Sequence, residues 1–202
     1  MRNKTFAAMA ILAVMMISLW ATSGQAMEDK QQFGLFLNGD QKVNDRIKLT
    51  FSASWTNFAG TTLPYTYLGL QQRINDHFSL GTALGYGFED TPQDSGMVYA
   101  LMPAFSSGKW SLYNDFEYWS GLNCLFTLHA LTYPVGPVRL GIDERTFYYF
   151  DSEDAAARTY RIGPSLRIPF SEQAQVGLFY WYSFENDGLD ANVFNMSLML
   201  NF

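Results

Sequence analysis

Charged side chains recur at every second position in several segments of the chain that are otherwise apolar. In an extended strand, this spacing places charged side chains on one face and apolar side chains on the other. Where such strands close into a barrel, one face lines the interior. The pattern predicts that seven basic side chains, three acidic ones and one histidine line a lumen: Arg46, Lys48, Arg73, Arg139, Arg145, Arg161, Arg167, Asp115, Glu117, Asp143 and His129.

The basic excess of this set allows two interpretations. Charges confined in a narrow lumen must be paired, so the set can be a structural ion-pair network that fills the barrel. Rings of basic side chains also select anions, so the set can line a narrow channel for small anionic solutes. Hairpin pairing is expected to place Arg145 beside Arg161, and His129 near Asp115 and Asp143. No cofactor or metal site is predicted.

A catalytic alternative starts from His77 and Ser79, which lie two residues apart on one strand face. Such a pair needs an orienting acid to work as base and nucleophile. The His-x-Ser pattern resembles the lipid A 3-O-deacylase family, which continues with Asn-Ala where this chain has Leu80-Gly81, and no matching Glu is evident. Ten-stranded omptin-like proteases are longer and need an Asp/His set at the external rim, whereas His129 lies far down its strand. A hydrolase acting on lipid or peptide is therefore the alternative, and a non-enzyme is the first prediction.

The N-terminal segment has the layout of a secretory signal peptide. Arg2 and Lys4 precede an apolar run over 6–21, and small residues lead to a cleavage site after Ala26. The sequence therefore predicts a signal peptide over 1–26 and an exported mature chain.

Composition narrows the class of the exported chain. The net charge of −6 gives no basic face for nucleic acid. Cys124 is the only cysteine, so no intrachain disulfide can form. Aromatic residues make up 17% of the chain, yet the mature part has no apolar stretch long enough for a membrane helix. These features favour a β-barrel held together by hydrogen bonds and packing.

Alternation with a period of two predicts an all-β protein, a transmembrane antiparallel up-and-down β-barrel. Most of the segments have the roughly 9–11 residues that a tilted strand needs to cross a bilayer. About ten strands are predicted, with eight or twelve as alternatives, because bacterial single-chain barrels have even counts. The predicted strands span 43–57, 63–74, 78–89, 96–105, 109–119, 123–133, 138–150, 158–169, 174–184 and 192–202.

The joins between these segments alternate in length. Short turn-forming joins at 75–76, 106–108, 134–137 and 171–173 predict periplasmic turns. The longer, acidic joins predict external loops, and they span 90–95, 151–157 and 185–191.

The last segment alternates up to Phe202. A terminal Phe on such a strand resembles the C-terminal signal read by the outer-membrane assembly machinery. Together with the signal peptide and aromatic residues at both strand ends, it makes the chain similar to small Gram-negative outer-membrane barrels of the porin-like and OmpA-like class. The resemblance implies an outer-membrane location with lipid, lipopolysaccharide and assembly-machinery contacts. The protein is taken as a monomer by default, although its oligomeric state stays open.

Three local assignments complete the prediction. Residues 31–38 also alternate, but counting them would give an odd number of strands, so 27–42 is interpreted as an N-terminal arm before a barrel at 43–202. Residues 123–133 are oriented with Leu128 toward lipid and His129 toward the lumen. Glu144 falls on the lipid face, where an acid is costly, and a β-bulge near Asp143 is expected to rotate it away.

Overall fold

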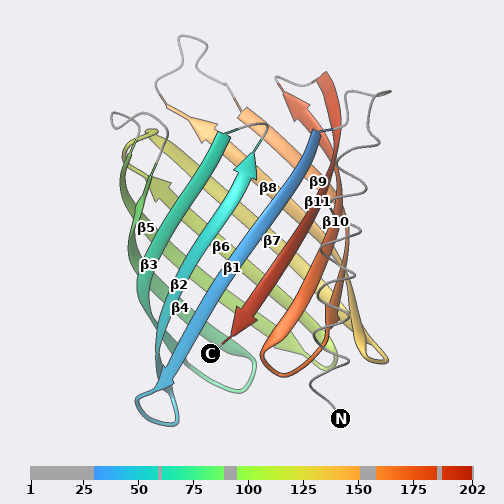
Figure 1. Ribbon diagram of the computed structural model, residues 1–202. Helices are drawn as coiled ribbons and strands as arrows, with labels where there is room; N and C mark the ends of the chain where they lie inside the picture. Colours follow the sequence, from blue (N-terminus) through green and yellow to red (C-terminus); the bar gives the residue numbers. More distant parts are fainter. Residues whose placement is uncertain (1–29, 59–60, 89–94, 151–157, 186–187, 202) are drawn as a thin grey trace, which may run out of the picture.

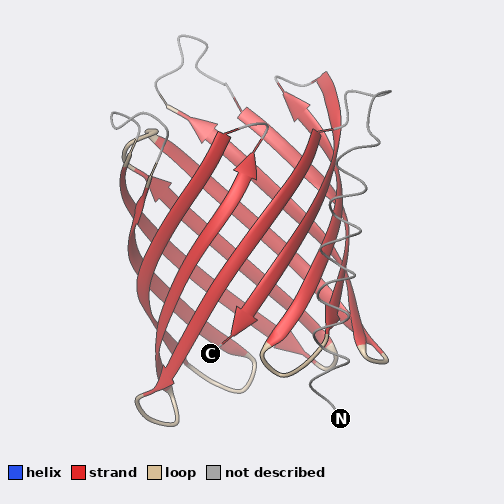
Figure 2. Cartoon of the chain, in the orientation of Figure 1, coloured by secondary structure: helices blue, strands red, loops and turns tan. Residues whose placement is uncertain are grey.

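The computed structural model describes residues 30–58, 61–88, 95–150, 158–185 and 188–201, so the predicted signal peptide and Phe202 lie outside the described residues. These residues form strands that close into a single barrel (Figures 1 and 2). In the described part of the chain there are eleven: β1 (Lys30–Lys42), β2 (Ile47–Phe58), β3 (Thr61–Arg73), β4 (Phe78–Gly87), β5 (Gly96–Ser107), β6 (Trp110–Trp119), β7 (Cys124–Val135), β8 (Val138–Tyr149), β9 (Arg158–Pro169), β10 (Ala174–Glu185) and β11 (Gly188–Asn201). Among the described residues, no helix is long and apolar enough to cross a membrane.

Strands that follow one another in sequence pair antiparallel, whereas β1 and β11 pair parallel and close the barrel. With an odd number of strands, the first and the last run in the same direction, so a closed barrel requires one parallel pair. The register aligns Phe33 with Met196 and Leu37 with Leu200. A predominantly antiparallel barrel of about ten strands is therefore confirmed, although the expected even count is wrong.

The interpretation of residues 27–42 as a separate arm is wrong for residues 30–42, which form β1. This strand pairs with β2 on one side and with β11 on the other. Without β1, the edges of β2 and β11 would each present a row of unpaired backbone N–H and C=O groups. Satisfying both edges at once explains why the alternating N-terminal segment joins the wall.

Short turns gather at one end of the barrel, the lower end in Figure 1. They lie at 43–46, 74–77, 108–109, 136–137 and 170–173. Gly108 and Gly136 both have a φ of 59°, which lets two-residue hairpin turns form at little steric cost. The four predicted short joins are thus confirmed as turns at one end. The predicted external loops at 90–95 and 151–157 lie almost wholly outside the described residues, while 188–191 belongs to β11 rather than to a loop.

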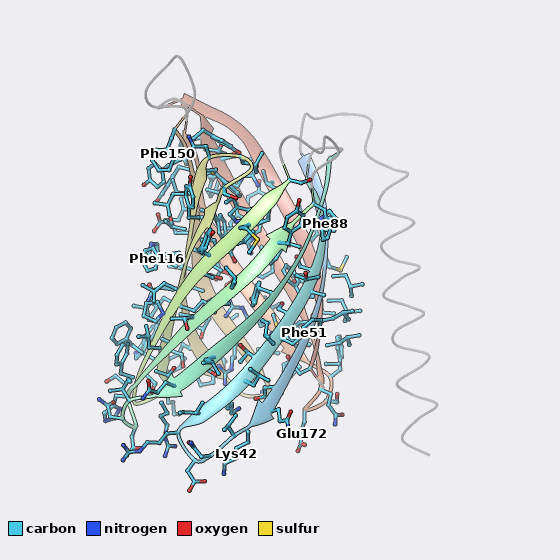
Figure 3. The ribbon with its side chains drawn as sticks, turned by 90° about the vertical axis from the view of Figure 1, so that its left-hand side faces the viewer. Lys42, Phe51, Phe88, Phe116, Phe150 and Glu172 are labelled. Atoms are coloured by element: carbon cyan, nitrogen blue, oxygen red, sulfur yellow. The ribbon has the colours of Figure 1, made fainter. Side chains whose placement is uncertain are left out.

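The two faces of the wall differ in composition. Large apolar side chains, such as Leu68, Tyr99 and Ile142, are more than half exposed on the outer surface. In Figure 3, Phe116 also lies on the outer side of the wall. The register resolves β5, which sequence alternation did not orient, because Ala100 pairs with the inward Ala83 and Glu117. The predicted division into an apolar outer face and a more polar inner face therefore holds for most strands.

Strand β7 is the exception, because its predicted orientation is reversed. Leu128 pairs with Asp115 on β6 and with Arg145 on β8, both of which line the interior. His129, one residue further on, therefore faces outward, and its assignment to the lumen is wrong. Alternation failed here because β7 carries apolar side chains on both faces, including the outward Leu131.

Candidate ligand cavity in the lumen

Part of the barrel interior is packed with large side chains from β10 and β11. Phe179, Trp181 and Val193 form a buried cluster, and Trp181 has 0% of its surface exposed. Glu117 on β6 is also almost inaccessible, with 2% exposed. Inward side chains of a water-filled channel would be solvated, so Trp181 and Val193 are packed within the barrel and do not face such a channel.

Arg145 on β8 joins this packing through aromatic contacts. Its guanidinium carbon lies 4.3 Å from the centroid of the Trp181 ring and 5.5 Å from that of Phe179. Such cation–π contacts stabilise a guanidinium inside a protein. The predicted neighbour is also in place, since Arg145 pairs with Arg161 across β8 and β9. Arg161 is turned toward Ser183, with its Nε 3.4 Å from the serine Oγ.

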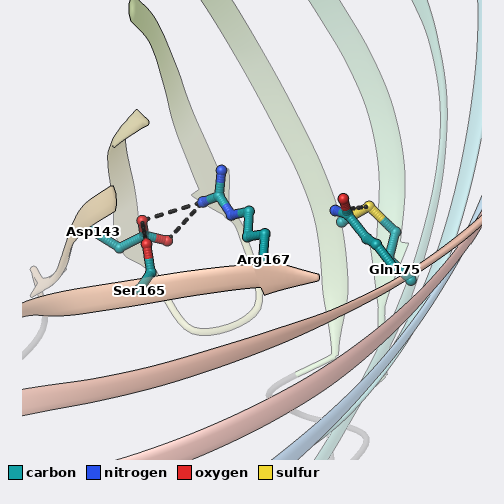
Figure 4. Close-up of polar contacts among 5 residues, drawn as sticks. Asp143, Ser165, Arg167 and Gln175 are labelled. Carbon is teal, nitrogen blue, oxygen red and sulfur yellow. Dashed lines mark hydrogen bonds and ion pairs between the residues drawn. The ribbon is translucent and has the colours of Figure 1, made fainter. Parts of the chain in front are cut away.

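Asp143 and Arg167 form an ion pair on the inner wall (Figure 4). One guanidinium nitrogen of Arg167 lies 2.9 Å and 3.1 Å from the two carboxylate oxygens, and Ser165 Oγ donates to Oδ1 at 2.8 Å. Asp143 is 1% exposed, so its charge is neutralised within the wall. This pair fits the predicted structural use of lumen charges.

A cavity of about 710 Å³ lies in the lumen and reaches the turn end, where Asp40 and Glu172 line it. Its walls combine aromatic rings with charged groups. Among its described lining residues, five are acidic and two are basic: Asp40, Asp115, Glu117, Asp143 and Glu172 against Arg145 and Arg167. The main cavity is thus acidic on balance, which differs from the predicted Arg-rich lumen.

Two of these carboxylates lie on neighbouring inward positions of β6. Asp115 accepts a hydrogen bond from Tyr113 Oη at 3.2 Å, and Glu117 accepts one from Trp119 Nε1 at 2.9 Å. Asp115 Oδ1 is buried without a hydrogen-bond partner. In the described part of the chain, neither carboxylate has a Lys or Arg nitrogen within ion-pair distance. These two acids, unlike Asp143, therefore form no ion pair with a described Lys or Arg side chain.

Aromatic rings surround the two acids from several strands. Tyr65 stacks on Tyr67 with centroids 5.8 Å apart and meets the Trp119 ring edge-on at 5.3 Å. Tyr113 and Phe126 line the same space. None of these residues was among the predicted site candidates. Sequence alternation could have indicated most of them. Tyr65 and Tyr67 share a strand face with the charged residue of β3, and Tyr113 and Trp119 share one with the acids of β6. Phe126 lies on the face of β7 that was assigned to lipid.

The other predicted candidates lie away from this cavity. Arg73 and Arg139 line a second cavity of about 290 Å³ at the turn end, next to His77. Lys48 forms an ion pair with Asp40 near the same end. Arg46 is exposed in the turn between β1 and β2, so it does not line the lumen.

His77 and Ser79, the proposed catalytic pair, lie at the turn end. His77 is exposed, its Nδ1 is 3.1 Å from the carbonyl oxygen of Ser106, and its backbone N–H donates to Asn75 Oδ1. Within the described ranges, no group of three His, Cys, Asp or Glu residues could hold a metal ion.

The outer wall carries a polar row across β6, β7 and β8. Asn114 pairs with His129, and His129 with Glu144, on neighbouring strands. His129 Nδ1 lies 2.8 Å from Asn114 Oδ1, and Thr146 Oγ1 donates to Glu144 Oε1 at 3.3 Å. The registers of β8 with β7 and with β9 run without a shift. The β-bulge expected near Asp143 is therefore absent from β8, and Glu144 stays on the outer face.

No family model and no curated protein matches this chain.

Proposed function

We propose that the protein is an integral barrel of a Gram-negative outer membrane, exported with a signal peptide over 1–26, and that its lumen is closed by packed side chains. The observation that carries the proposal is the apolar outer wall. Soluble monomers rarely expose large contiguous apolar patches. Here exposed apolar side chains recur around the wall, among them Leu68 on β3, Leu101 on β5 and Ile142 on β8.

A soluble barrel of the lipocalin kind is the rival. Such a barrel hides its apolar face inside and presents charged side chains to water. In this chain the inward positions hold Asp143 and Arg167, while Leu68 and Ile142 face outward. That arrangement suits lipid contact and supports the membrane over the rival. Outer-membrane lipid, lipopolysaccharide and the assembly machinery are the partners that this proposal includes.

A pair of arginine substitutions tests membrane insertion. Leu68 lies in the middle of β3, whereas Val43 is 62% exposed in the turn between β1 and β2. In a bilayer, Leu68→Arg should cost about 2–4 kcal/mol of folding free energy, because the charge meets the hydrocarbon. Val43→Arg should cost little. Urea unfolding in phospholipid vesicles measures both, and equal, small effects would contradict the membrane proposal.

The second part of the proposal is a structural, non-enzymatic barrel rather than an open channel. The burial of Trp181 and Val193 supports it, because inward side chains that line an open channel would be exposed to water. Planar-bilayer recordings of the refolded wild type should show no discrete openings. The Trp181→Ala variant, which shortens the plug, should conduct more readily. Steady wild-type conductance would instead favour the narrow channel.

A further inference from the structure

We infer that the outer wall at β7 and β8 is an interface between two copies of the protein, in which His129 of each chain bonds to Glu144 of the other. This inference rests on the proposed membrane location and adds a partner to it. The two residues are neighbours, since His129 pairs with Glu144 across β7 and β8 (Figure 1). Both lie near the middle of their strands, Cys124–Val135 and Val138–Tyr149, which is hydrocarbon depth in a spanning barrel.

The contacts of Asn114 fix which nitrogen of His129 carries a proton. A carbonyl oxygen only accepts hydrogen bonds, so the atom of the Asn114 side chain that lies 3.1 Å from the carbonyl oxygen of Pro103 is Nδ2. The other atom, Oδ1, lies 2.8 Å from His129 Nδ1, which must therefore donate. In a neutral imidazole, the second nitrogen, Nε2, is then an acceptor. Among the described residues, nothing donates to it.

Glu144 presents the complementary group. Its Oε1 accepts a hydrogen bond from Thr146 Oγ1 at 3.3 Å, and no described Lys or Arg nitrogen lies within ion-pair distance of its carboxyl group. Within one chain, His129 and Glu144 are adjacent but form no hydrogen bond with each other. A carboxyl group can share a proton with an imidazole nitrogen, so each of the two groups is a suitable partner for the other.

The surroundings of this pair rule out lipid and water as its partners. Leu131 and Ile142, the next outward pair on the same strands, are 39% and 55% exposed, so the polar groups lie within an apolar surface. Acyl chains have neither donors nor acceptors, and the bilayer core holds no water to replace them. Polar groups at this depth are unfavourable unless they meet protein groups. The partner must therefore be a protein surface that offers a carboxyl group beside an imidazole acceptor.

A second copy of the same wall is such a surface. In a two-fold symmetric interface, residue i of one copy contacts residue j of the other, and j contacts i. Copies of one barrel insert with the same orientation, so the axis runs along the membrane normal. An axis that passes between β7 and β8 places each His129 opposite the partner's Glu144, because the rotation exchanges two strands that lie about 4.8 Å apart. Both bonds are then made at once.

Energy transfer between copies in phospholipid vesicles tests the inference. Dyes are attached at Lys109→Cys in the exposed turn between β5 and β6, while the native Cys124, which is 1% exposed, is shielded from labelling. Donor-labelled and acceptor-labelled full chains are refolded together at increasing ratios of lipid to protein. We expect transfer above the level of random mixing, with a dependence on protein density that fits a dimer. Transfer at the random level at every ratio would overturn the inference.

Four variants locate the interface. His129→Leu and Glu144→Leu should each weaken association by about ten-fold or more, because each removes both hydrogen bonds of the dimer. Glu144→Gln keeps a donor for His129 Nε2 and should retain association. Thr66→Leu is the matched control, since it also replaces an outward polar side chain by leucine, but on β3. Association that survives His129→Leu and Glu144→Leu would contradict the assignment, as would an equal loss in Thr66→Leu.

Heat-modifiable gel migration shows whether each variant is folded, because His129→Leu also leaves Asn114 Oδ1 without its donor. Membrane insertion is measured separately by the pair Leu68→Arg and Val43→Arg. A barrel that inserts but stays monomeric contradicts this inference alone. A chain that stays with the soluble periplasm contradicts the membrane proposal, on which the interface depends.

Discussion

The two faces of β6, β7 and β8 both carry polar groups, but these groups find their partners in different ways. On the inner face, Asp115 and Arg145 flank Leu128, and on the outer face Asn114 and Glu144 flank His129. Both rows place polar groups in the middle of the same three strands. The partners of these groups, however, come from different places.

Inner polar groups also find partners beyond the neighbouring strand. Arg145 on β8 reaches past β9 to the Trp181 ring on β10. On the outer face, none of the residues that the structure describes lies opposite the wall. Outer groups therefore bond sideways, as His129 does with Asn114. Because a barrel is closed, its inward side chains can contact side chains of strands that are not their direct neighbours, whereas its outward side chains cannot.

The largest effect is expected from breaking the inner ion pair. Asp143→Ala leaves Arg167 without its carboxylate in a mostly buried position, which should destabilise the barrel by about 3–5 kcal/mol. Urea unfolding followed by tryptophan fluorescence measures it. The double variant Asp143→Ala with Arg167→Met removes both charges and should recover much of the loss. Equal losses in the single and double variants would show that the charge pairing is unimportant.

A smaller effect is expected from breaking the outer row. Asn114 joins two groups, since its Oδ1 lies beside His129 Nδ1 and its Nδ2 donates to the carbonyl oxygen of Pro103. Asn114→Leu leaves these groups unpaired and should cost about 1–3 kcal/mol. Adding His129→Leu removes one orphaned group and should return part of the stability. If Asn114→Leu is neutral, the lateral bonds do not support the wall.

The smallest effect has the opposite sign. Glu144→Gln keeps the shape of the side chain but removes a charge from the proposed lipid face. It should stabilise the protein in vesicles by about 1 kcal/mol, because carboxylates at mid-bilayer depth are unfavourable. The gain should be smaller in a detergent that admits water to the wall. A clear loss in vesicles would mean that Glu144 has a charged partner there.

Much of the wall was predictable from residue order. The strand segments from 43 onward agree with β2 to β11 within a few residues, and the turns at Gly108 and Gly136 fall where the short joins predict them. These features are local, because alternation reports which residues share a face and turn residues report where a strand must reverse.

The tertiary structure decided the features that depend on distant partners. Whether Leu128 or His129 faces inward on β7 follows from pairing with β6 and β8, since both faces carry apolar residues. Whether residues 30–42 form an arm or a strand depends on the free edge of β11, almost the whole chain away. The acidic, aromatic cavity could not be predicted from the sequence, because it depends on contacts between strands. Arg145 lies against the Trp181 ring, and Arg167 pairs with Asp143. Sequence order determined the faces of single strands, whereas closure of the barrel determined which charges meet, because the lumen joins side chains that no local pattern relates.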